Sequence, residues 1–478
     1  YHDVTRGRIP TMDYLKKLVD RMSFYKLNQL QLYMEHTFQF QAFSEVWRDD
    51  TPLTAQDILE LDAYCRKRHV ELIPSIACFG HLYKVLRTKT YGALCELSGM
   101  EEEPFGFMDR MRHHTLDVSN PASMRLVKSL IDEFMPLFTS QYFNICADET
   151  FDLGKGKSAA LAAEMGTQRL YLDFVKELCE YVVSKGKTPM FWGDIICEFP
   201  EAVQELPKET ICLNWGYDAD WPEDSTRKLA EAGVRLYNCP GVSGWDQLVN
   251  QIHVSYENIS RMCQYAHTYK AEGLLNTDWG DCGHINHPDF SLPGMIYGAA
   301  FSWNLDIPEF EDMNHQISRI AYGDETETLV SLLVRISESW KFTWRNAVDW
   351  MEQGKLQLLH NAEIYENAVM DLEQIKTELY QSVTNLPTTQ RGQIHAYLIA
   401  VQGMILLQKI GKVLAENDAA SGKTVNGKAG KEEYRKLAEA LEYWLYDYKE
   451  LWRTTSREAE LFRIEHVICA YADWLRAI

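Results

Sequence analysis

The sequence has no surplus of positive charge. Its 48 Lys and Arg residues are outnumbered by 69 Asp and Glu residues, which gives a formal net charge of −21. Proteins that bind nucleic acid attract its phosphates with clustered Lys and Arg, so this balance argues against a nucleic-acid partner. A neutral or cationic ligand fits the composition better.

Long apolar runs are also missing. No stretch of 18 apolar residues is present, so the sequence predicts no membrane span. Hydrophobic residues make up 46% and charged residues 24% of the chain, which is typical of soluble globular proteins. At 478 residues the chain exceeds the usual size of a single domain, so we expect more than one unit.

The cysteines show no paired spacing. There are 11 of them, scattered along the chain and never arranged as C-x-x-C, which argues against a zinc ribbon or a disulfide framework. We expect reduced, buried thiols, which favour a cytoplasmic location. No signal peptide is visible, but the opening "YHDV" already reads as a strand, so we expect natural residues to precede Tyr1, and localisation stays open.

Short apolar runs alternate with segments of helical periodicity from residue 1 to about residue 305. Helical patterns at 11–22, 54–68 and 171–185 fall between the apolar runs. This alternation predicts an α/β fold, a (β/α)8 TIM barrel, whose typical size is about 250 residues before insertions. We place the barrel in residues 1–325 and expect its strands at 1–4, 28–35, 71–77, 141–148, 188–195, 210–217, 235–241 and 273–280.

Strand signals stop after about residue 325. Amphipathic patterns predict long helices over 372–383, 396–416 and 431–462. Residues 417–431 are rich in Gly, Ser, Lys and Asn, which predicts a flexible surface loop. We therefore predict an α-helical C-terminal domain in residues 326–478, whose apolar faces are consistent with covering the barrel or with forming a homodimer.

Acidic and aromatic residues gather at the predicted ends of the strands. The active sites of TIM barrels lie at this end, whereas the interior layers are usually filled by Val, Ile and Leu. A single Trp more often fills a core, but several at successive strand ends predict a lined pocket, and flat aromatic faces suit sugar rings. The residues concerned are Asp3, Glu35, His36, Asp148, Glu149, Trp192, Asp194, Trp215, Tyr217, Asp278, Trp279 and Asp281.

Asp148 and Glu149 stand side by side in "FNICADET" (143–150), at the end of the fourth strand. Two neighbouring carboxyls in a partly apolar setting repel, so one tends to stay protonated while the other ionises. A protonated carboxyl can donate to a leaving-group oxygen, the first requirement for cleaving a glycosidic bond. The pair alone is equally consistent with a helix N-cap at a solvated turn.

The adjacency of the two acids limits the mechanism. In ordinary retaining glycosidases the two carboxyls lie about 5–5.5 Å apart, on opposite sides of the sugar. Neighbours in sequence do not easily flank a bond in this way. They can cooperate when the substrate supplies its own nucleophile and one acid only orients that nucleophile.

Three motifs, in order, resemble glycoside hydrolase family 20, the β-N-acetylhexosaminidases, across residues 1 to about 305. They are "DVTRGRIPTMDYLKKLVDRMSFYKLNQLQLYMEHTF" (3–38), "IPSIACFGH" (73–81) and "FNICADET". The resemblance implies that Glu149 is the general acid/base and that Asp148 orients the 2-acetamido group of the substrate. The carbonyl oxygen of that group would attack the anomeric carbon, and Glu149 would activate water to open the oxazolinium-type intermediate with retention of configuration.

The resemblance also implies the substrate and its pocket. We expect an exo-acting enzyme that removes terminal GlcNAc or GalNAc from a glycan and needs no cofactor. Trp192, Trp215 and Trp279 match positions that wall the acetamido pocket, Glu35 matches a second-strand acid and His81 the histidine of Gly-His. We add two strand-end residues as substrate-binding candidates, Tyr217 and Asp278.

The chain departs from the family pattern in four places. Asn144 to Ala147 replace the usual His-x-Gly-Gly before Asp-Glu, and Ala77 replaces an acid before Gly-His. The Arg that grips sugar hydroxyls would lie upstream of Tyr1. "CPGVSGWD" (239–246) stands where a seventh-strand Tyr would contact the acetamido oxygen, so Tyr217 and Tyr237 are the candidates to replace that Tyr.

Two other functions remain open at this point. One is another acetamido-dependent glycosidase, such as a family-84-like enzyme, although those resemble a paired Asp-Asp arrangement. The other is a catalytically silent sugar-binding protein. His284 and His287 could bind metal, but the acetamido mechanism needs none, so we predict no metal site. Neither the choice between GlcNAc and GalNAc nor contact of the helical domain with a longer glycan follows from the sequence.

Overall fold

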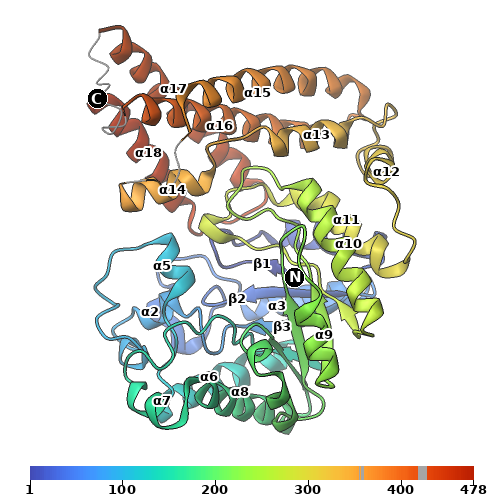
Figure 1. Cartoon of the computed structure of the whole chain (residues 1–478), viewed down its shortest axis with the longest axis vertical. Coiled ribbons are helices and arrows are strands. Elements are labelled where there is room, and N and C mark those ends of the chain that lie inside the picture. Colours follow the sequence, from blue (N-terminus) through green and yellow to red (C-terminus); the bar gives the residue numbers. More distant parts are fainter. Residues whose placement is uncertain (355, 357–359, 418–427) are drawn as a thin grey trace.

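The computed structural model describes residues 1–354, 356, 360–417 and 428–478. Eight parallel strands pair in sequence order, β1 to β8, and form a (β/α)8 TIM barrel (Figure 1). All eight strands lie where the sequence predicts them, so this prediction is confirmed. They are β1 (His2–Asp3), β2 (Gln29–Met34), β3 (Glu71–Ile76), β4 (Tyr142–Asn144), β5 (Thr188–Trp192), β6 (Ile211–Trp215), β7 (Arg235–Cys239) and β8 (Gly273–Leu274).

The barrel closes through residues that follow β8 rather than through β8 itself. His2 in β1 forms a parallel bridge with Asp278. The backbone N–H of Asp3 donates to the carbonyl of Asp278 at 2.9 Å, and the N–H of Asp278 donates to the carbonyl of Tyr1 at 2.9 Å. This closure brings the segment 278–281 beside the segment that follows β1.

Amphipathic helices cover the outside of the barrel. Their starts are fixed by side-chain caps, as at Thr11, which accepts from the N–H of Tyr14, and at Thr54, which forms a capping box with Asp57. The helices predicted at 11–22, 54–68 and 171–185 are confirmed as α1, α3 and α8. The barrel helices are α1 (Met12–Phe24), α2 (Ser44–Trp47), α3 (Ala55–Arg66), α4 (Tyr83–Leu86), α5 (Phe107–Arg112), α6 (Pro121–Phe134), α7 (Ala159–Met165), α8 (Thr167–Ser184), α9 (Asp224–Glu231), α10 (Ile252–Thr268) and α11 (Leu292–Trp303).

In the described part of the chain, every regular element after β8 is a helix, so the predicted helical C-terminal region is confirmed. It packs as a layer beside the barrel, coloured yellow to red in Figure 1. Its elements are α12 (Phe310–Tyr322), α13 (Leu329–Glu338), α14 (Trp344–Gln353), α15 (Ala362–Ser382), α16 (Arg391–Glu416), α17 (Lys428–Arg453) and α18 (Leu461–Ala477). The helices predicted at 372–383 and 396–416 correspond to α15 and α16.

The prediction of one helix over 431–462 is wrong, because α17 ends at Arg453. The next residues leave the helix and pair with the segment that follows β1. Thr455 accepts from the N–H of Thr11 at 2.9 Å, and Ser456 forms an antiparallel bridge with Pro10. Of the loop predicted at 417–431, residues 428–431 belong to α17, and residues 418–427 lie outside the described residues.

Helix α16 is the one described helix that is long and apolar enough to cross a membrane. However, 72% of its most apolar 18-residue stretch is buried against the rest of the protein. It packs between α15 and α17 in a hydrophobic core that also takes in side chains from α10 and α11. These contacts are those of a core helix. A helix buried inside a protein can be as long and as apolar as a membrane span.

The helical region contacts the loops that follow the strands. Trp344 in α14 donates from Nε1 to the carbonyl of Cys282 at 2.7 Å. Arg8, which follows β1, donates to the hydroxyl of Tyr448 in α17 at 3.2 Å. Because TIM-barrel active sites lie at this end of the strands, the helical region borders the place where a site is expected.

Candidate active site

The backbone turns sharply at the end of β4. Cys146, Ala147 and Glu149 have φ angles of 57°, 70° and 48°, in the left-handed region that residues other than glycine rarely occupy. This turn explains why the strand predicted over 141–148 ends at Asn144. Strained backbone of this kind costs of order 1–3 kcal/mol per residue and clusters at functional sites.

Several hydrogen bonds hold this turn in place. The side chain of Asn144 accepts from the N–H of Cys146 at 2.9 Å. The N–H of Trp192 in β5 donates to the carbonyl of Cys146 at 2.9 Å, and the hydroxyl of Tyr171 in α8 donates to the carbonyl of Ala147 at 3.0 Å. The N–H of Glu149 donates to the carboxyl of Asp194 at 3.0 Å.

His81 lies between the two adjacent acids. Its Nε2 is 3.5 Å from Asp148 Oδ2 and 3.2 Å from Glu149 Oε2. Burial alone would lower the pKa of His81, but the charge of Asp148 and the close approach of both acids outweigh burial and raise the pKa to about 10. An imidazolium therefore joins the two carboxyls at neutral pH. The side chain of Glu149 is 25% exposed and that of Asp148 is 9% exposed, so Glu149 is the more accessible acid.

The same three residues form the one group in the described residues that could hold a metal ion. Their ligand atoms all lie within 4.8 Å of one another. A metal would have to displace the proton of His81, which the two acids hold strongly. His284 and His287 are buried and lie outside this group, and burial lowers the pKa of each, to about 4 and about 3. The absence of a metal site stays a prediction.

Aromatic side chains form a continuous wall beside the acids. Trp192 and Trp279 have ring centroids 5.6 Å apart. Trp215 and Tyr217 stack with centroids 5.2 Å apart, and Trp279 Nε1 donates to the Tyr217 hydroxyl at 2.7 Å, which joins the two pairs. Trp192 is fully buried, whereas Trp215 and Tyr217 are partly exposed. The wall therefore combines a closed inner part with an open outer part.

Two tyrosines that sequence reasoning missed complete the wall. The ring of Tyr1 lies 5.0 Å from those of Trp192 and Trp279, and the ring of Tyr33 lies 5.2 Å from that of Trp279. Of the two candidates for an acetamido contact, Tyr217 lies in this wall. Tyr237 lies in the middle of β7 and pairs with Gly273 at the start of β8.

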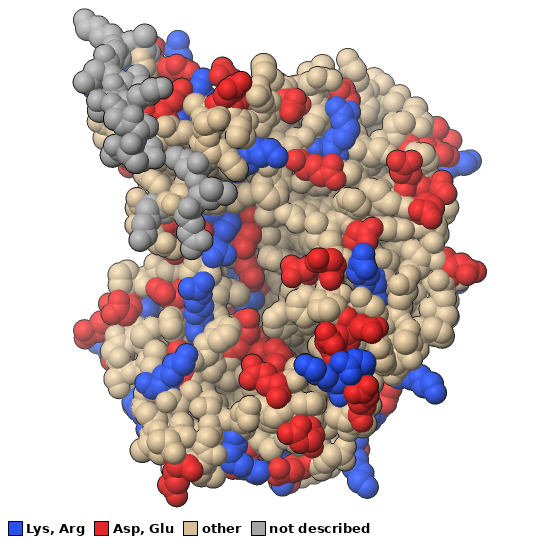
Figure 2. Space-filling model, viewed as in Figure 1, with Lys and Arg blue, Asp and Glu red and all other residues tan. Residues whose placement is uncertain are grey.

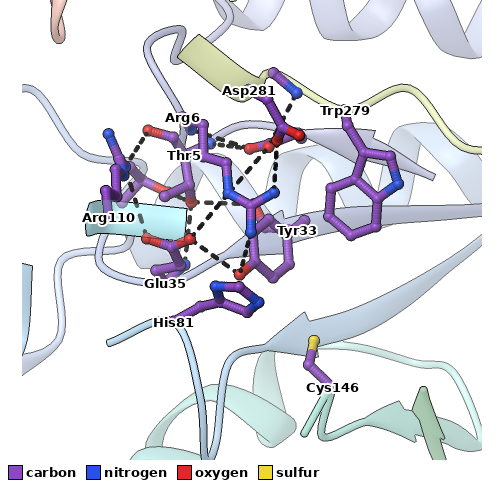
Figure 3. Close-up of polar contacts among 12 residues, drawn as sticks. Thr5, Arg6, Tyr33, Glu35, His81, Arg110, Cys146, Trp279 and Asp281 are labelled. Carbon is purple, nitrogen blue, oxygen red and sulfur yellow. Dashed lines mark hydrogen bonds and ion pairs between the residues drawn. The ribbon is translucent and has the colours of Figure 1, made fainter. Parts of the chain in front are cut away.

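Glu35 lies in a buried network of ion pairs (Figure 3). Its Oε1 accepts from Arg6 Nε at 3.3 Å and from the Tyr33 hydroxyl at 3.0 Å, and its Oε2 lies 3.6 Å from Arg110. Arg110 in α5 also pairs with Glu460, which lies just before α18. Glu35 is only 3% exposed, so its carboxylate faces these cations. Its role in substrate binding stays a prediction.

Two acids that follow β8, Asp278 and Asp281, have different partners. Asp278 accepts from His2 Nδ1 at 3.1 Å. Burial alone would raise the pKa of Asp278, but this bond and the charge of His2 keep it below its usual value. Asp281 accepts from Arg6 at 2.8 Å, on the side of Trp279. Burial raises the pKa of Asp281 to about 7 in spite of Arg6. Figure 2 shows Asp and Glu gathered around a hollow between the barrel and the helical region.

Comparisons with known proteins agree with this fold. The model of "Glycosyl hydrolase family 20, catalytic domain" matches residues 2–279. Hexosaminidase D of Bos taurus is 23% identical over 301 residues, which cover 59% of this chain and 84% of that protein.

Two solved structures share the fold at low sequence identity. The β-N-acetylhexosaminidase from Bacteroides fragilis superposes with a TM-score of 0.54 at 16% identity, over 68% of this chain and 70% of that one. The chitobiase of Flavobacterium johnsoniae superposes with a TM-score of 0.53 at 15% identity, over 95% of this chain and 77% of that one. Because the family model matches more than half of the sequence, this chain belongs to glycosyl hydrolase family 20 and is a glycoside hydrolase.

Proposed function

We propose that the protein is an exo-acting β-N-acetylhexosaminidase that removes terminal GlcNAc or GalNAc from glycans. The observation that carries this proposal is the convergence of Asp148 and Glu149 on one imidazolium beside an aromatic wall. The relatives, a hexosaminidase and a β-N-acetylhexosaminidase, support the same substrate class. The catalytic unit is residues 1–325, and residues 326–478 form a helical unit beside it.

The two acids divide the work between them. Glu149, which is the more exposed, protonates the oxygen of the leaving group. Asp148 is the more buried and accepts the N–H of the substrate's 2-acetamido group, which turns the carbonyl oxygen of that group toward the anomeric carbon. The two carboxyls thus act on the same side of the sugar, while the nucleophile comes from the substrate.

The reaction then proceeds in two balanced steps. The first step starts from the form of the enzyme in which Glu149 is protonated: the acetamido oxygen bonds to the anomeric carbon as the glycosidic bond breaks, and the aglycone leaves with the proton of Glu149. In the second, Glu149 takes a proton from water, and the hydroxide opens the oxazolinium-type ring from the face that the aglycone left. Two displacements give retention of configuration.

The aromatic wall supplies the pocket for this cyclisation. Trp192, Trp215 and Trp279 hold the acetamido methyl group, because flat apolar faces exclude water around it. Tyr217 contributes its hydroxyl, which Trp279 fixes in position. His81 holds both carboxyls, so the distance between the acid and the orienting group does not depend on the substrate.

Three matched substrates test the proposal. The purified protein is assayed with p-nitrophenyl β-GlcNAc, β-GalNAc and β-glucoside, and the first product is followed by NMR. We expect hydrolysis of at least one N-acetyl sugar with initial release of the β-anomer, and no detectable hydrolysis of the glucoside, which lacks the amide. Binding of GlcNAc without any hydrolysis would instead support a silent sugar-binding protein.

A further inference from the structure

Asp194 makes the one direct hydrogen bond to the backbone of Glu149 from another strand end. It lies two residues after β5, and its Oδ2 accepts from the N–H of Glu149 at 3.0 Å. Its other oxygen, Oδ1, is buried and has no hydrogen-bond partner among the described residues. The side chain of Asp194 thus contacts the backbone of Glu149 through one buried carboxyl group.

Glu149 needs such a contact because its backbone is strained. With φ at 48°, it occupies a region that costs a residue with a Cβ about 1–2 kcal/mol and persists only when the surroundings fix it. Trp192 and Tyr171 hold the carbonyls of Cys146 and Ala147, which precede the acids. The carbonyl of Glu149 accepts from the N–H of Phe151 within the same turn, whereas the bond to Asp194 holds the Glu149 N–H from another strand end.

The neighbouring loop leaves the turn little freedom to relax in another direction. Gly80 lies so close that a Cβ on it would be 2.6 Å from the carbonyl oxygen of Asp148. The Asp148 carbonyl and the Glu149 N–H belong to one planar peptide unit, which lies close to Gly80 at its oxygen and is held by Asp194 at its nitrogen. If the bond at Asp194 is lost, we expect this whole unit to tilt, which changes the direction of the Glu149 side chain.

The charge of Asp194 is compatible with this position. Burial, together with the charges of Asp148 and Glu149, raises the pKa of the Asp194 carboxyl to about 8. The carboxyl is therefore mostly protonated at neutral pH. It can accept the Glu149 N–H through Oδ2 without placing a third negative charge beside the two acids.

We propose that Asp194 is a positioning residue for the proposed general acid, because its side chain fixes the Glu149 peptide and so aims the Glu149 carboxyl at the leaving group. This inference rests on the proposed function. It goes beyond that function, since Asp194 neither touches the substrate nor exchanges a proton with it. A defect in this contact should slow protonation of the leaving group more than it weakens sugar binding.

A series of aryl β-N-acetylglucosaminides with leaving groups of different acidity tests the proposal. Departure of 2,4-dinitrophenolate needs little help from an acid, whereas departure of 4-methoxyphenolate needs protonation. For Asp194→Ala, we expect kcat/KM, which reports the first step alone, to fall about 100-fold with the 4-methoxyphenyl substrate and less than about 5-fold with the dinitrophenyl substrate. For Asp194→Asn, which keeps an oxygen acceptor, most of the activity on the 4-methoxyphenyl substrate should return.

Two further variants keep the test decisive. Asp62 is a buried carboxyl in α3 that accepts from Thr139, and Asp62→Asn should leave the dependence on the leaving group as in the wild type. If Asp194→Ala does not fold, Asp194→Ser keeps a polar group that is too short to reach the Glu149 amide, and it should show the same steep dependence.

The outcomes separate this inference from the proposed function. If the wild type hydrolyses none of the N-acetylhexosaminides, the proposed function fails. If the wild type is active and a folded Asp194→Ala or Asp194→Ser variant loses activity equally on all leaving groups, or loses none, the positioning role is overturned. An Asp194→Asn variant as impaired as Asp194→Ala on the 4-methoxyphenyl substrate would also contradict it.

Discussion

Two clusters of charged side chains lie at the same end of the barrel, and they are built in opposite ways. The structural cluster is centred on two buried arginines: Arg6 pairs with Glu35 and Asp281, and Arg110 pairs with Glu35 and with Glu460, which also pairs with Arg463. The catalytic cluster, named for its proposed role, has three acids around one cation: His81, Asp148, Glu149 and Asp194, of which His81 and Glu149 have positive φ angles. In the structural cluster, ion pairs link the barrel to the helical region. In the catalytic cluster, the acids outnumber the one cation, which provides carboxyl groups that can exchange protons.

The structural cluster also links the two regions of the chain. Glu460 comes from the segment between α17 and α18, and it reaches the barrel through Arg110. Burial alone would raise the pKa of Glu460, but the charges of Arg110 and Arg463 outweigh it and hold the pKa well below its usual value. The helical region therefore supplies part of the charge balance behind the active site.

The largest effect on activity is expected from Glu149→Gln in the catalytic cluster. The substitution keeps the shape of the side chain but removes the proton that the leaving group needs. We expect kcat for substrates with poor leaving groups to fall about 10²–10⁴-fold, the usual range for a general acid. Steady-state rates measured with the p-nitrophenyl and 4-methoxyphenyl glycosides check this, and wild-type rates would remove Glu149 from its role.

The largest effect on stability is expected from Arg110→Met in the structural cluster. The change leaves Glu35 and Glu460 buried without their shared partner, which typically costs about 3–5 kcal/mol. Arg112→Met is the matched control, because Arg112 lies on the same helix but is exposed. Urea unfolding measures both variants. A loss below about 1 kcal/mol for Arg110→Met, similar to that of the control, would show that the buried pairs do not hold the two regions together.

The two clusters should respond to pH in opposite directions. Asp194 and His81 have pKa values raised to about 8 and about 10, so the folded state holds more protons than the unfolded state as the pH rises. Their contribution to the free energy of unfolding therefore falls with rising pH, through about pH 4–8 for Asp194 and about pH 6.5–10 for His81. Glu460 has a lowered pKa, so its contribution is present above about pH 4.5 and is lost as the pH falls.

Unfolding measured between pH 5 and pH 9 tests this difference. We expect Asp194→Asn to flatten the fall in the free energy of unfolding between pH 5 and pH 8, because the amide does not titrate. The control Asp62→Asn should leave the slope unchanged. An unchanged slope in Asp194→Asn would mean that this carboxyl already ionises at low pH in the folded protein.

The smallest effect is expected from Ala147→Gly, which relieves strain in the catalytic cluster. Ala147 has a φ of 70°, where a Cβ costs about 1 kcal/mol relative to glycine. We expect the free energy of unfolding to rise by up to about 1 kcal/mol while the activity stays near that of the wild type. Thermal and urea unfolding give the value, and a clear loss of stability would show that packing of the Ala147 methyl group outweighs the strain.

The fold follows from the sequence because its signals are periodic. The eight strands and the barrel helices lie where apolar runs alternate with helical patterns, and the adjacent acids mark the end of β4. The early end of β4 could not be predicted from the sequence, because no residue type near Cys146 and Ala147 indicates that they adopt left-handed φ angles. The break after Arg453 did not follow either, because it depends on pairing of residues 454–460 with the segment that follows β1.

The partners of the site residues were harder to predict than the residues themselves. Glu35 stood out as a strand-end acid, but its burial depends on Arg6 and Arg110, and Arg110 in turn pairs with Glu460, 350 positions further along the chain. No sequence spacing indicates such a contact. Asp194 likewise stood out at the end of β5, but its bond to the Glu149 peptide depends on a turn that only the folded chain reveals.

The most direct measurement compares substrates whose amide is a progressively weaker nucleophile. The p-nitrophenyl β-glycosides of N-acetyl-, N-fluoroacetyl-, N-difluoroacetyl- and N-trifluoroacetylglucosamine differ little in size, while each fluorine withdraws electrons from the carbonyl oxygen. If that oxygen attacks the anomeric carbon, kcat/KM falls steeply with each fluorine added. Equal rates across the series would show that the nucleophile comes from elsewhere, and would contradict the division of roles between Asp148 and Glu149.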